Sequence, residues 1–225
     1  MMSLPRTLEP EVMDSIEDAV DYDSMDHREV NRRFVEDLLK VVTIDQHTGW
    51  MLDLGTGTAQ IPIELVRNCS VAKVHAVDLA EQMLVLAAKN VRAAGFENNI
   101  RLERIDAKGL PWPNGHFAGV ISNSIVHHIP EPLGVLREAV RVVQPGGWLF
   151  FRDLARPGNL GQLRWLIETY AGDANDHQRQ LFDDSLHAAL TVDEVRELVT
   201  SLGLDGRAVS LSSDRHWTWA ARKPG

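Results

Sequence analysis

The chain has 225 residues, of which 44% are hydrophobic and 24% charged, as is usual for a soluble globular protein with one sizeable core. Its formal net charge of -9 argues against a nucleic-acid backbone as the main partner, because such binding depends on Lys and Arg neutralising phosphates. A single cysteine excludes an internal disulfide, and no apolar stretch suits a signal peptide or a membrane-spanning helix, so we expect a cytoplasmic protein.

The N-terminal 45 residues are predicted to form a helical segment. Residues 11–25 are acidic and include Tyr22, one of only two tyrosines. Between His27 and Val42, apolar side chains recur at helical spacing and predict an amphipathic helix; they are Val30, Phe34, Leu38 and Val41.

Strands and helices then alternate. The predicted strands are Gly49–Leu54, Lys73–Val77, Ile100–Ile105, Phe117–Ser122 and Trp148–Arg152. The predicted helices between them are Ala59–Asn68, Ala80–Ala94 and Glu131–Val143, the last closed by the run Gln144–Gly147. Near-continuous apolar strands separated by amphipathic helices predict an α/β fold with a doubly wound, mostly parallel, Rossmann-like sheet that has helices on both faces.

The pattern changes after the fifth strand. Leu160–Tyr170 and Ala174–Leu190 read as two helices with no strand between them, which we interpret as an insertion over the strand ends. Thr191–Glu194 is a capping box that starts a further helix. Two short β patterns, Arg207–Leu211 and His216–Arg222, predict an antiparallel hairpin at the edge of the sheet.

The first predicted strand runs into a glycine turn, residues 53–59, with the sequence Asp-Leu-Gly-Thr-Gly-Thr-Ala. A strand, a glycine turn and a helix form nucleotide sites in open α/β sheets, since glycine lets the backbone approach a ligand. A dinucleotide fingerprint would place a third glycine at position 60, where this chain has Gln60. Because the Asp53 carboxylate suits a cationic ligand better than a pyrophosphate, we interpret the turn as a nucleoside site without a phosphate requirement. A purely structural corner is the alternative.

The run 53–59 resembles the first motif of class I S-adenosylmethionine-dependent methyltransferases, and Val77-Asp78-Leu79 and Asp106-Ala107 resemble later elements of the same family. The resemblance covers roughly Trp50 to Asp153. It implies S-adenosylmethionine as the cofactor and S-adenosylhomocysteine as its product. It also implies that Asp78 accepts hydrogen bonds from the ribose hydroxyls and that Asp106 accepts one from the adenine amino group.

Ligands of open α/β sheets bind beyond the carboxyl ends of the strands. The predicted cofactor-binding residues on this rule and on the resemblance are Asp53, Leu54, Gly55, Thr56, Gly57, Asp78, Leu79, Met83, Asp106, Ala107, Ser122 and Asn123. The family also implies an aromatic residue from the N-terminal segment, for which Tyr22 is the candidate. Core packing for Met83 and a solvated acidic face around Tyr22 are the alternatives.

Two adjacent histidines, His127 and His128, follow the fourth strand. Adjacent side chains are not expected to face one point from a helix, and no metal-ligand spacing is present, so we expect no metal site. In the family a histidine at this place often lies by the active site, which makes His128 a candidate. A general base helps if the acceptor is a hydroxyl or a protonated amine, and His128 or Asp153, at the end of the fifth strand, could serve as the catalytic residue. A buried, hydrogen-bonded histidine is the alternative.

The predicted function is methyl transfer from S-adenosylmethionine to a small-molecule acceptor, with no nucleic-acid or membrane partner. We expect one domain; its predicted parts are an N-terminal cap (1–45), a cofactor-binding core (46–155), a helical lid (156–190) and a C-terminal helix with a β-hairpin (191–225). The alternatives are a protein or RNA acceptor, a catalytically silent cofactor-binding module and a nicotinamide-dependent dehydrogenase, against which Gln60 argues. The acceptor, the methylated atom and the oligomeric state stay open.

Overall fold

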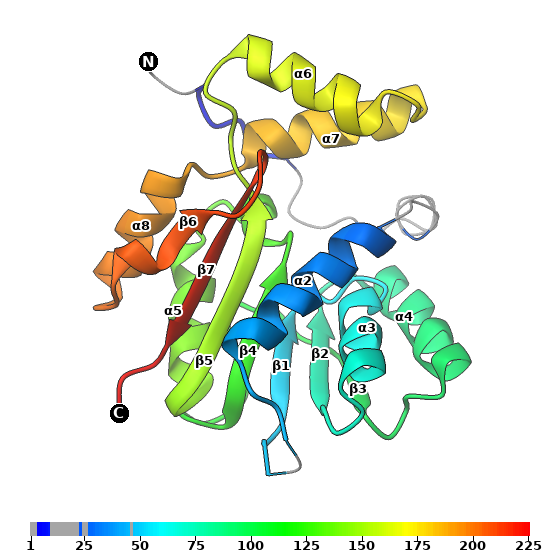
Figure 1. Ribbon diagram of the computed structural model, residues 1–225, viewed down its shortest axis with the longest axis vertical. Helices are drawn as coiled ribbons and strands as arrows, with labels where there is room; N and C mark the ends of the chain where they lie inside the picture. Colours follow the sequence, from blue (N-terminus) through cyan, green and yellow to red (C-terminus); the bar gives the residue numbers. More distant parts are fainter. Residues whose placement is uncertain (1–3, 10–22, 24–26, 46) are drawn as a thin grey trace. The chain divides into compact units, whose positions relative to one another are not determined.

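The computed structural model describes residues 4–9, 23, 27–45 and 47–225 (Figure 1). Its seven-stranded sheet has the order β3-β2-β1-β4-β5-β7-β6. The strands are β1 (Met51–Leu54), β2 (Val74–Asp78), β3 (Ile100–Arg104), β4 (Phe117–Asn123), β5 (Val143–Leu154), β6 (Val209–Leu211) and β7 (His216–Arg222). The pairs β1–β2, β1–β4 and β2–β3 are parallel, whereas β6 and β7 are antiparallel. The predicted fold class is therefore confirmed, including its antiparallel C-terminal edge.

The contacts within the chain divide it into two compact units. Unit 1 comprises the described residues of 1–11, 124–133 and 152–219, and unit 2 those of 12–123, 134–151 and 220–225. The predicted boundaries of the cap, core, lid and C-terminal segment stay predictions.

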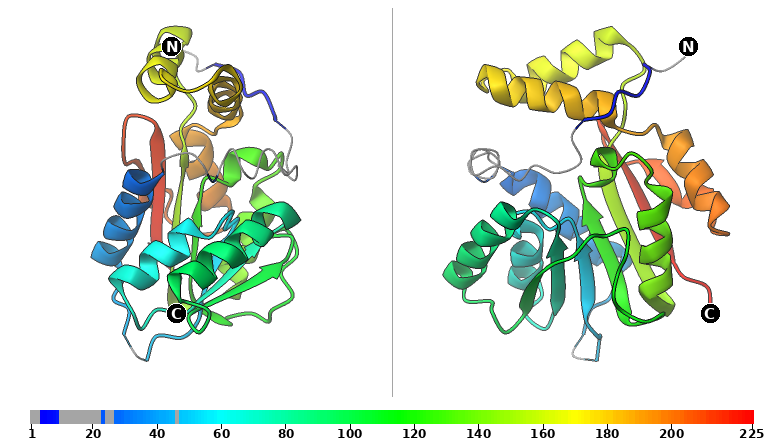
Figure 2. Two further views of the ribbon diagram at one scale, coloured as in Figure 1. Left: turned by 90° about the vertical axis from the view of Figure 1, so that its right-hand side faces the viewer. Right: turned by 180° about the vertical axis from the view of Figure 1, so that it is seen from behind.

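Unit 2 holds most of the parallel sheet and the helices that cover it. These helices are α2 (Arg28–Val41), α3 (Gln60–Asn68), α4 (Glu81–Ala94) and α5 (Leu133–Val142), each within about two residues of its predicted bounds. Figures 1 and 2 show α2 and α3 on one face of the strands and α5 on the opposite face. Phe34 of α2 meets Phe150 of β5 edge to face, with ring centroids 5.0 Å apart, and so fixes α2 on the sheet.

The start of β5 differs from the prediction. We expected residues 144–147 to form the turn that closes a helix, but the strand already begins at Val143. Gly146 donates to the carbonyl of Lys223 (2.9 Å), and Lys223 donates to the carbonyl of Gly147 (2.8 Å). These bonds to a distant segment keep the Pro-Gly-Gly run within the strand, with Gly146 at a φ of 74°, although the run taken alone is typical of a turn.

Unit 1 contains the predicted helical insertion. Its helical elements are η1 (Val126–His128), α6 (Leu160–Ala171), α7 (Asp176–Ala188), α8 (Val192–Ser201) and η2 (Gly206–Ala208). A small apolar core joins α6 and α7; its buried members are Leu154, Leu163, Leu166, Leu186 and Ala189. The predicted capping box is confirmed at the start of α8, where the Thr191 side chain accepts from the Glu194 amide.

Among the described residues, no helix is long and apolar enough to cross a membrane.

Candidate cofactor site and a histidine cluster

The glycine turn between β1 and α3 has a backbone that only glycine adopts readily at two positions. Gly55 and Gly57 have φ angles of 67° and 54°. The turn is tied to the end of β2, because the Thr56 amide donates to the carbonyl of Val77 (2.9 Å) and the Gly57 amide donates to Oδ2 of Asp78 (2.8 Å).

Asp78 links three strand ends. While Oδ2 accepts from the glycine turn, Oδ1 accepts from the Ala80 amide at the start of α4 (2.9 Å). The Asp78 carbonyl accepts from the amide of Ile105, the residue before Asp106 (3.0 Å). Asp106 itself accepts from the Lys108 amide and pairs with the Lys108 ammonium group. The ends of β1, β2 and β3 are therefore neighbours.

Asp53 is buried within β1, two residues before Gly55 of the glycine turn. Its Oδ2 has no hydrogen-bond partner among the described residues. Burial raises the pKa of the Asp53 carboxyl to about 7, and the negative charge of Asp78 acts in the same direction. A cation beside Asp53 would therefore stabilise the ionised carboxylate.

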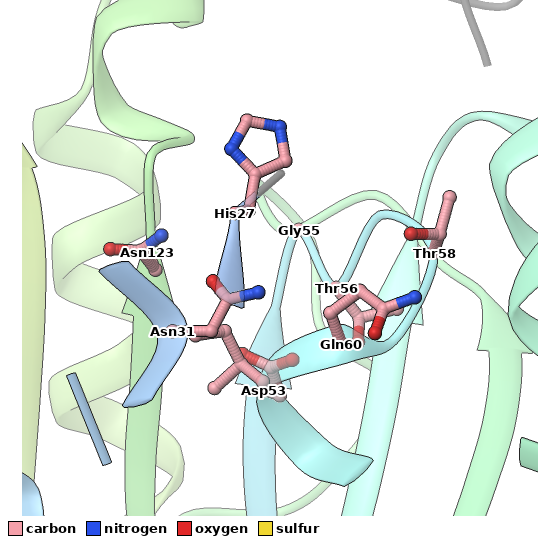
Figure 3. A pocket seen from close by; sticks show the side chains of 9 residues that line it. His27, Asn31, Asp53, Gly55, Thr56, Thr58, Gln60 and Asn123 are labelled. Carbon is pink, nitrogen blue, oxygen red and sulfur yellow. The ribbon is translucent and has the colours of Figure 1, made fainter. Parts of the chain in front are cut away.

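A hollow of about 360 Å³, including the space open to solvent, lies beside Asp53 (Figure 3). It is lined by His27, Asn31, Asp53, Gly55, Thr56, Thr58, Gln60, Ile61 and Asn123. Thr58 Oγ1 and Asn123 Oδ1 are, like Asp53 Oδ2, buried and without a hydrogen-bond partner in the described part of the chain. Buried polar atoms are almost always paired, so these unpaired atoms around a hollow fit a polar ligand with cationic and hydrogen-bonding groups.

Comparisons with known proteins agree with this geometry. Residues 52–151 match the family model described as "Methyltransferase domain". The chain is 30% identical over 119 residues to a demethylmenaquinone methyltransferase of Desulfitobacterium hafniense, covering 52% of this chain and 47% of that protein. It is 27% identical over 185 residues to the demethylmenaquinone methyltransferase of Protochlamydia amoebophila, covering 77% and 76%. The chain thus spans about half of the first relative and three quarters of the second.

The fold agrees as well. A crystal structure of an S-adenosylmethionine-dependent methyltransferase from Aquifex aeolicus superimposes with a TM-score of 0.67, at 17% identity, covering 92% of this chain and 98% of that one. Residues 52–151 of this chain form a domain of the class I S-adenosylmethionine-dependent methyltransferases. The family resemblance is confirmed, and with it the enzyme class and its cofactor.

The methyltransferase brings only part of the predicted cofactor set to the hollow. Asp53, Gly55, Thr56 and Asn123 line it. Predicted residues outside its lining are Leu54, Gly57, Asp78, Leu79, Met83, Asp106, Ala107 and Ser122. The Ser122 hydroxyl donates to the Leu54 carbonyl between β4 and β1 (2.9 Å), and Met83 packs in a small apolar cluster at the start of α4. Tyr22 lies outside the described residues, and all these assignments stay predictions.

Several lining residues were not predicted. His27 and Asn31 come from the start of α2, which the sequence marks only as amphipathic, and no motif distinguishes them. Gln60 served only as an argument against a dinucleotide-binding turn and was not predicted as a lining residue. Its amide donates to Asp23 (3.3 Å), as does the amide of Asn90 (3.0 Å), so a residue of the N-terminal segment is anchored to α3 and α4.

In unit 1 of the methyltransferase, His127 and Asp153 form a buried pair. The ring Nδ1 lies 2.5 Å from Asp153 Oδ1, and the His127 amide donates to Asp153 Oδ2 (3.1 Å). Burial opposes ionisation of both groups, but their mutual attraction outweighs it, so the pKa of His127 is raised and the pKa of Asp153 is lowered. Asp153 also accepts from the Leu154 amide, so its carboxylate is fully engaged within the protein.

Both histidines face one carboxylate oxygen. Oε1 of Glu9 lies 3.5 Å from Nε2 of His127 and 2.9 Å from Nδ1 of His128. The expectation that adjacent histidines cannot face one point is therefore wrong. It assumed an α-helix, in which consecutive side chains diverge by about 100°. Here the pair ends a three-residue 3₁₀ turn, and the two rings lie side by side with centroids 4.1 Å apart.

Proposed function

We propose that this methyltransferase transfers the methyl group of S-adenosylmethionine to a small-molecule acceptor. The observation that carries the cofactor part is the buried, unpartnered Asp53 carboxylate oxygen at a hollow beside the glycine turn. The acceptor class is supported by the two relatives, both named for a small quinone precursor, and by the net charge of -9, which disfavours RNA.

Different residues of the chain would bind different parts of the cofactor. We assign the ribose hydroxyls to Asp78, the adenine amino group to Asp106 and the positively charged part of the cofactor to the Asp53 carboxylate. When bound, S-adenosylmethionine supplies a methyl group that is already activated. The protein then has to orient the acceptor and exclude water.

The predicted catalytic residues, His128 and Asp153, belong to unit 1. Three protein donors already occupy the Asp153 carboxylate, so we assign it a positioning role that acts through His127. The His128 side chain is about one-fifth exposed, which leaves it available for the acceptor. His128→Ala is expected to slow turnover with little effect on cofactor affinity. The matched control is His177→Ala, which removes an exposed imidazole from α7.

The deciding experiment incubates the protein with S-adenosylmethionine labelled in its methyl group and a fractionated cell extract. We expect label in the small-molecule fraction, identified by mass analysis, and less label with Asp78→Ala at the same sub-saturating cofactor concentration. Label in protein or RNA would replace the proposed acceptor class. Tight cofactor binding without transfer to any fraction would support a silent cofactor-binding module.

We place the enzyme in the cytoplasm, because its one cysteine suits a reducing compartment. Cell fractionation with detection of the chain tests this location. Recovery in an oxidising compartment would contradict it.

A further inference from the structure

A cluster of three side chains in unit 1, Glu9, His127 and His128, has the composition of a metal site; it is called the His–Glu cluster below. We propose that it binds one divalent transition-metal ion, of which Zn²⁺ and Co²⁺ are the test cases. This proposal departs from the sequence-based expectation of no metal site.

The spacing of the donor atoms carries the proposal. Ligands held at about 2.0–2.2 Å from one ion lie about 3.0 Å apart in an octahedral site and about 3.4 Å apart in a tetrahedral one. Glu9 Oε1 is 2.9 Å from His128 Nδ1 and 3.5 Å from His127 Nε2. All three donor atoms lie within 4.8 Å of one another. One ion can therefore contact all three with only small side-chain shifts.

Two of the donors form a close pair whose geometry is poor for a direct hydrogen bond. Glu9 Oε1 and His128 Nδ1 are buried and, although 2.9 Å apart, have no hydrogen bond of acceptable geometry within the described part of the chain. The Glu9 side chain is only 9% exposed and that of His127 only 4%. Buried polar atoms that face each other without bonding are rare, and an ion between them would satisfy both.

The surrounding residues orient two of the three ligands. Metal-binding histidines usually donate their second ring N–H to a carboxylate, and His127 Nδ1 lies against Asp153. With the proton on Nδ1, the lone pair of Nε2 points toward Glu9. The Ser185 hydroxyl donates to Oε2 of Glu9 (3.2 Å), which leaves Oε1 for the ion.

The backbone that carries Glu9 is held in place. The Arg6 guanidinium donates to the carbonyls of Ala188 (2.7 Å) and Ile129 (2.9 Å). The Thr7 amide donates to the carbonyl of His187 (3.1 Å). These bonds restrain the segment that precedes Glu9 and so limit where the Glu9 carboxylate can lie.

The donor set selects the class of ion. Two imidazoles and one carboxylate suit Zn²⁺ and its first-row neighbours, whereas Mg²⁺ and Ca²⁺ prefer oxygen ligands. Three protein ligands leave at least one position for water or another oxygen donor. The competing occupant is a proton on one of the histidines, which would form an ion pair with Glu9 without any metal.

The test uses the full chain without an affinity tag, freed of metal with a chelator. The chain is equilibrated with Zn²⁺, Co²⁺ or Mg²⁺, passed through gel filtration and analysed for metal content. We expect one Zn²⁺ or Co²⁺ per chain, no retained Mg²⁺, and visible absorption bands from bound Co²⁺. Glu9→Gln and His128→Ala should each weaken Zn²⁺ binding at least a hundredfold.

The matched controls, His177→Ala and Glu168→Gln, remove the same groups from exposed positions and should bind Zn²⁺ like the wild type. Asp153→Asn should weaken binding by about 10- to 100-fold through loss of ligand orientation. Circular dichroism checks that each variant folds. A wild-type chain that retains no ion overturns the proposal, as does Zn²⁺ binding that the Glu9 and His128 variants leave unchanged. The readout is metal content, so it is independent of methyl transfer.

Discussion

We expect the buried carboxyl of Asp53 to make the affinity for S-adenosylmethionine depend on pH. Its pKa of about 7 in the free protein means that it is largely protonated at pH 6. A cationic ligand lowers that pKa, so binding at pH 6 releases a proton. We expect affinity for S-adenosylmethionine to rise between about pH 5 and 8 and then level off. Calorimetry in two buffers of different ionisation enthalpy measures the released proton, and an affinity independent of pH would refute the role of Asp53.

The same pKa predicts how Asp53 affects folding. The folded-state pKa of about 7 lies above the ordinary value of 3.8, so the folded state keeps a proton that the unfolded state loses between these pH values. Asp53 therefore costs increasing stability as pH rises through this range, and the full cost applies above pH 7. At pH 8, Asp53→Asn should raise the free energy of unfolding by a few kcal/mol, so the variant should unfold at a higher denaturant concentration than the wild type. The difference in free energy should shrink toward pH 4. Urea titrations at both pH values measure this; a constant difference would contradict it.

Asp78 should matter for binding in two ways. Asp78→Ala removes the proposed ribose contacts and also the acceptors for the Gly57 and Ala80 amides. We expect S-adenosylmethionine to bind about 1–3 kcal/mol more weakly, as measured by calorimetry. Gln180→Ala, a change on the exposed face of α7, is the control and should bind normally. Unchanged affinity in the Asp78 variant would remove Asp78 from the site.

At the level of single residues, the sequence predicted those site residues that lie at the ends of strands. Ligands lie beyond strand ends, and this rule led to Asp53, Gly55 and Asn123, which do line the hollow. It could not find Asn31, because only the packing of α2 on the sheet brings that side chain there. Nor could it find Glu9, which reaches His127 from a distant part of the chain and lies in no recognisable motif.

At the level of elements, periodic hydrophobicity predicted the helices and strands because one face of each is buried. The prediction was wrong at the start of β5, where backbone bonds to Lys223 override the turn preference of Pro145, Gly146 and Gly147. Local sequence contains no information about that partner. The parallel direction of the central strands was predicted correctly, because near-continuous apolar strands alternate with amphipathic helices along the chain.

Two glycines of neighbouring elements should respond oppositely to the same substitution. A Cβ at Gly119 in β4 would overlap the indole ring of Trp148, whereas a Cβ at Gly134 in α5 would meet nothing within 4 Å. Gly119→Ala should lower the free energy of unfolding by about 1–3 kcal/mol through overpacking. Gly134→Ala should raise it by up to about 1 kcal/mol, because alanine favours the helix. Urea titration of both variants tests this, and similar effects of the two changes would contradict the close packing of β4 on Trp148.

For the whole molecule, the lining of the hollow beside Asp53 belongs entirely to unit 2, while the His–Glu cluster belongs entirely to unit 1. Each site can therefore be loaded and measured separately. The chain therefore has two separate proposed binding sites, one for a charged nucleoside and one for a metal cation. The sequence shows the first through a compact motif; the second depends on residues that only the fold brings together.

The cofactor should stabilise the whole protein by mass action. S-adenosylmethionine at a hundred times its dissociation constant adds about 2.7 kcal/mol to the free energy of unfolding. For a chain of this length, that corresponds to a rise in Tm of about 5–10 °C. Scanning calorimetry measures the shift, and hydrogen exchange should show added protection at the glycine turn and at the start of α4. Asp78→Ala should show a smaller shift at the same cofactor concentration. A Tm that does not change with saturating cofactor, in the wild type, would mean that the folded chain does not bind S-adenosylmethionine at the hollow beside Asp53.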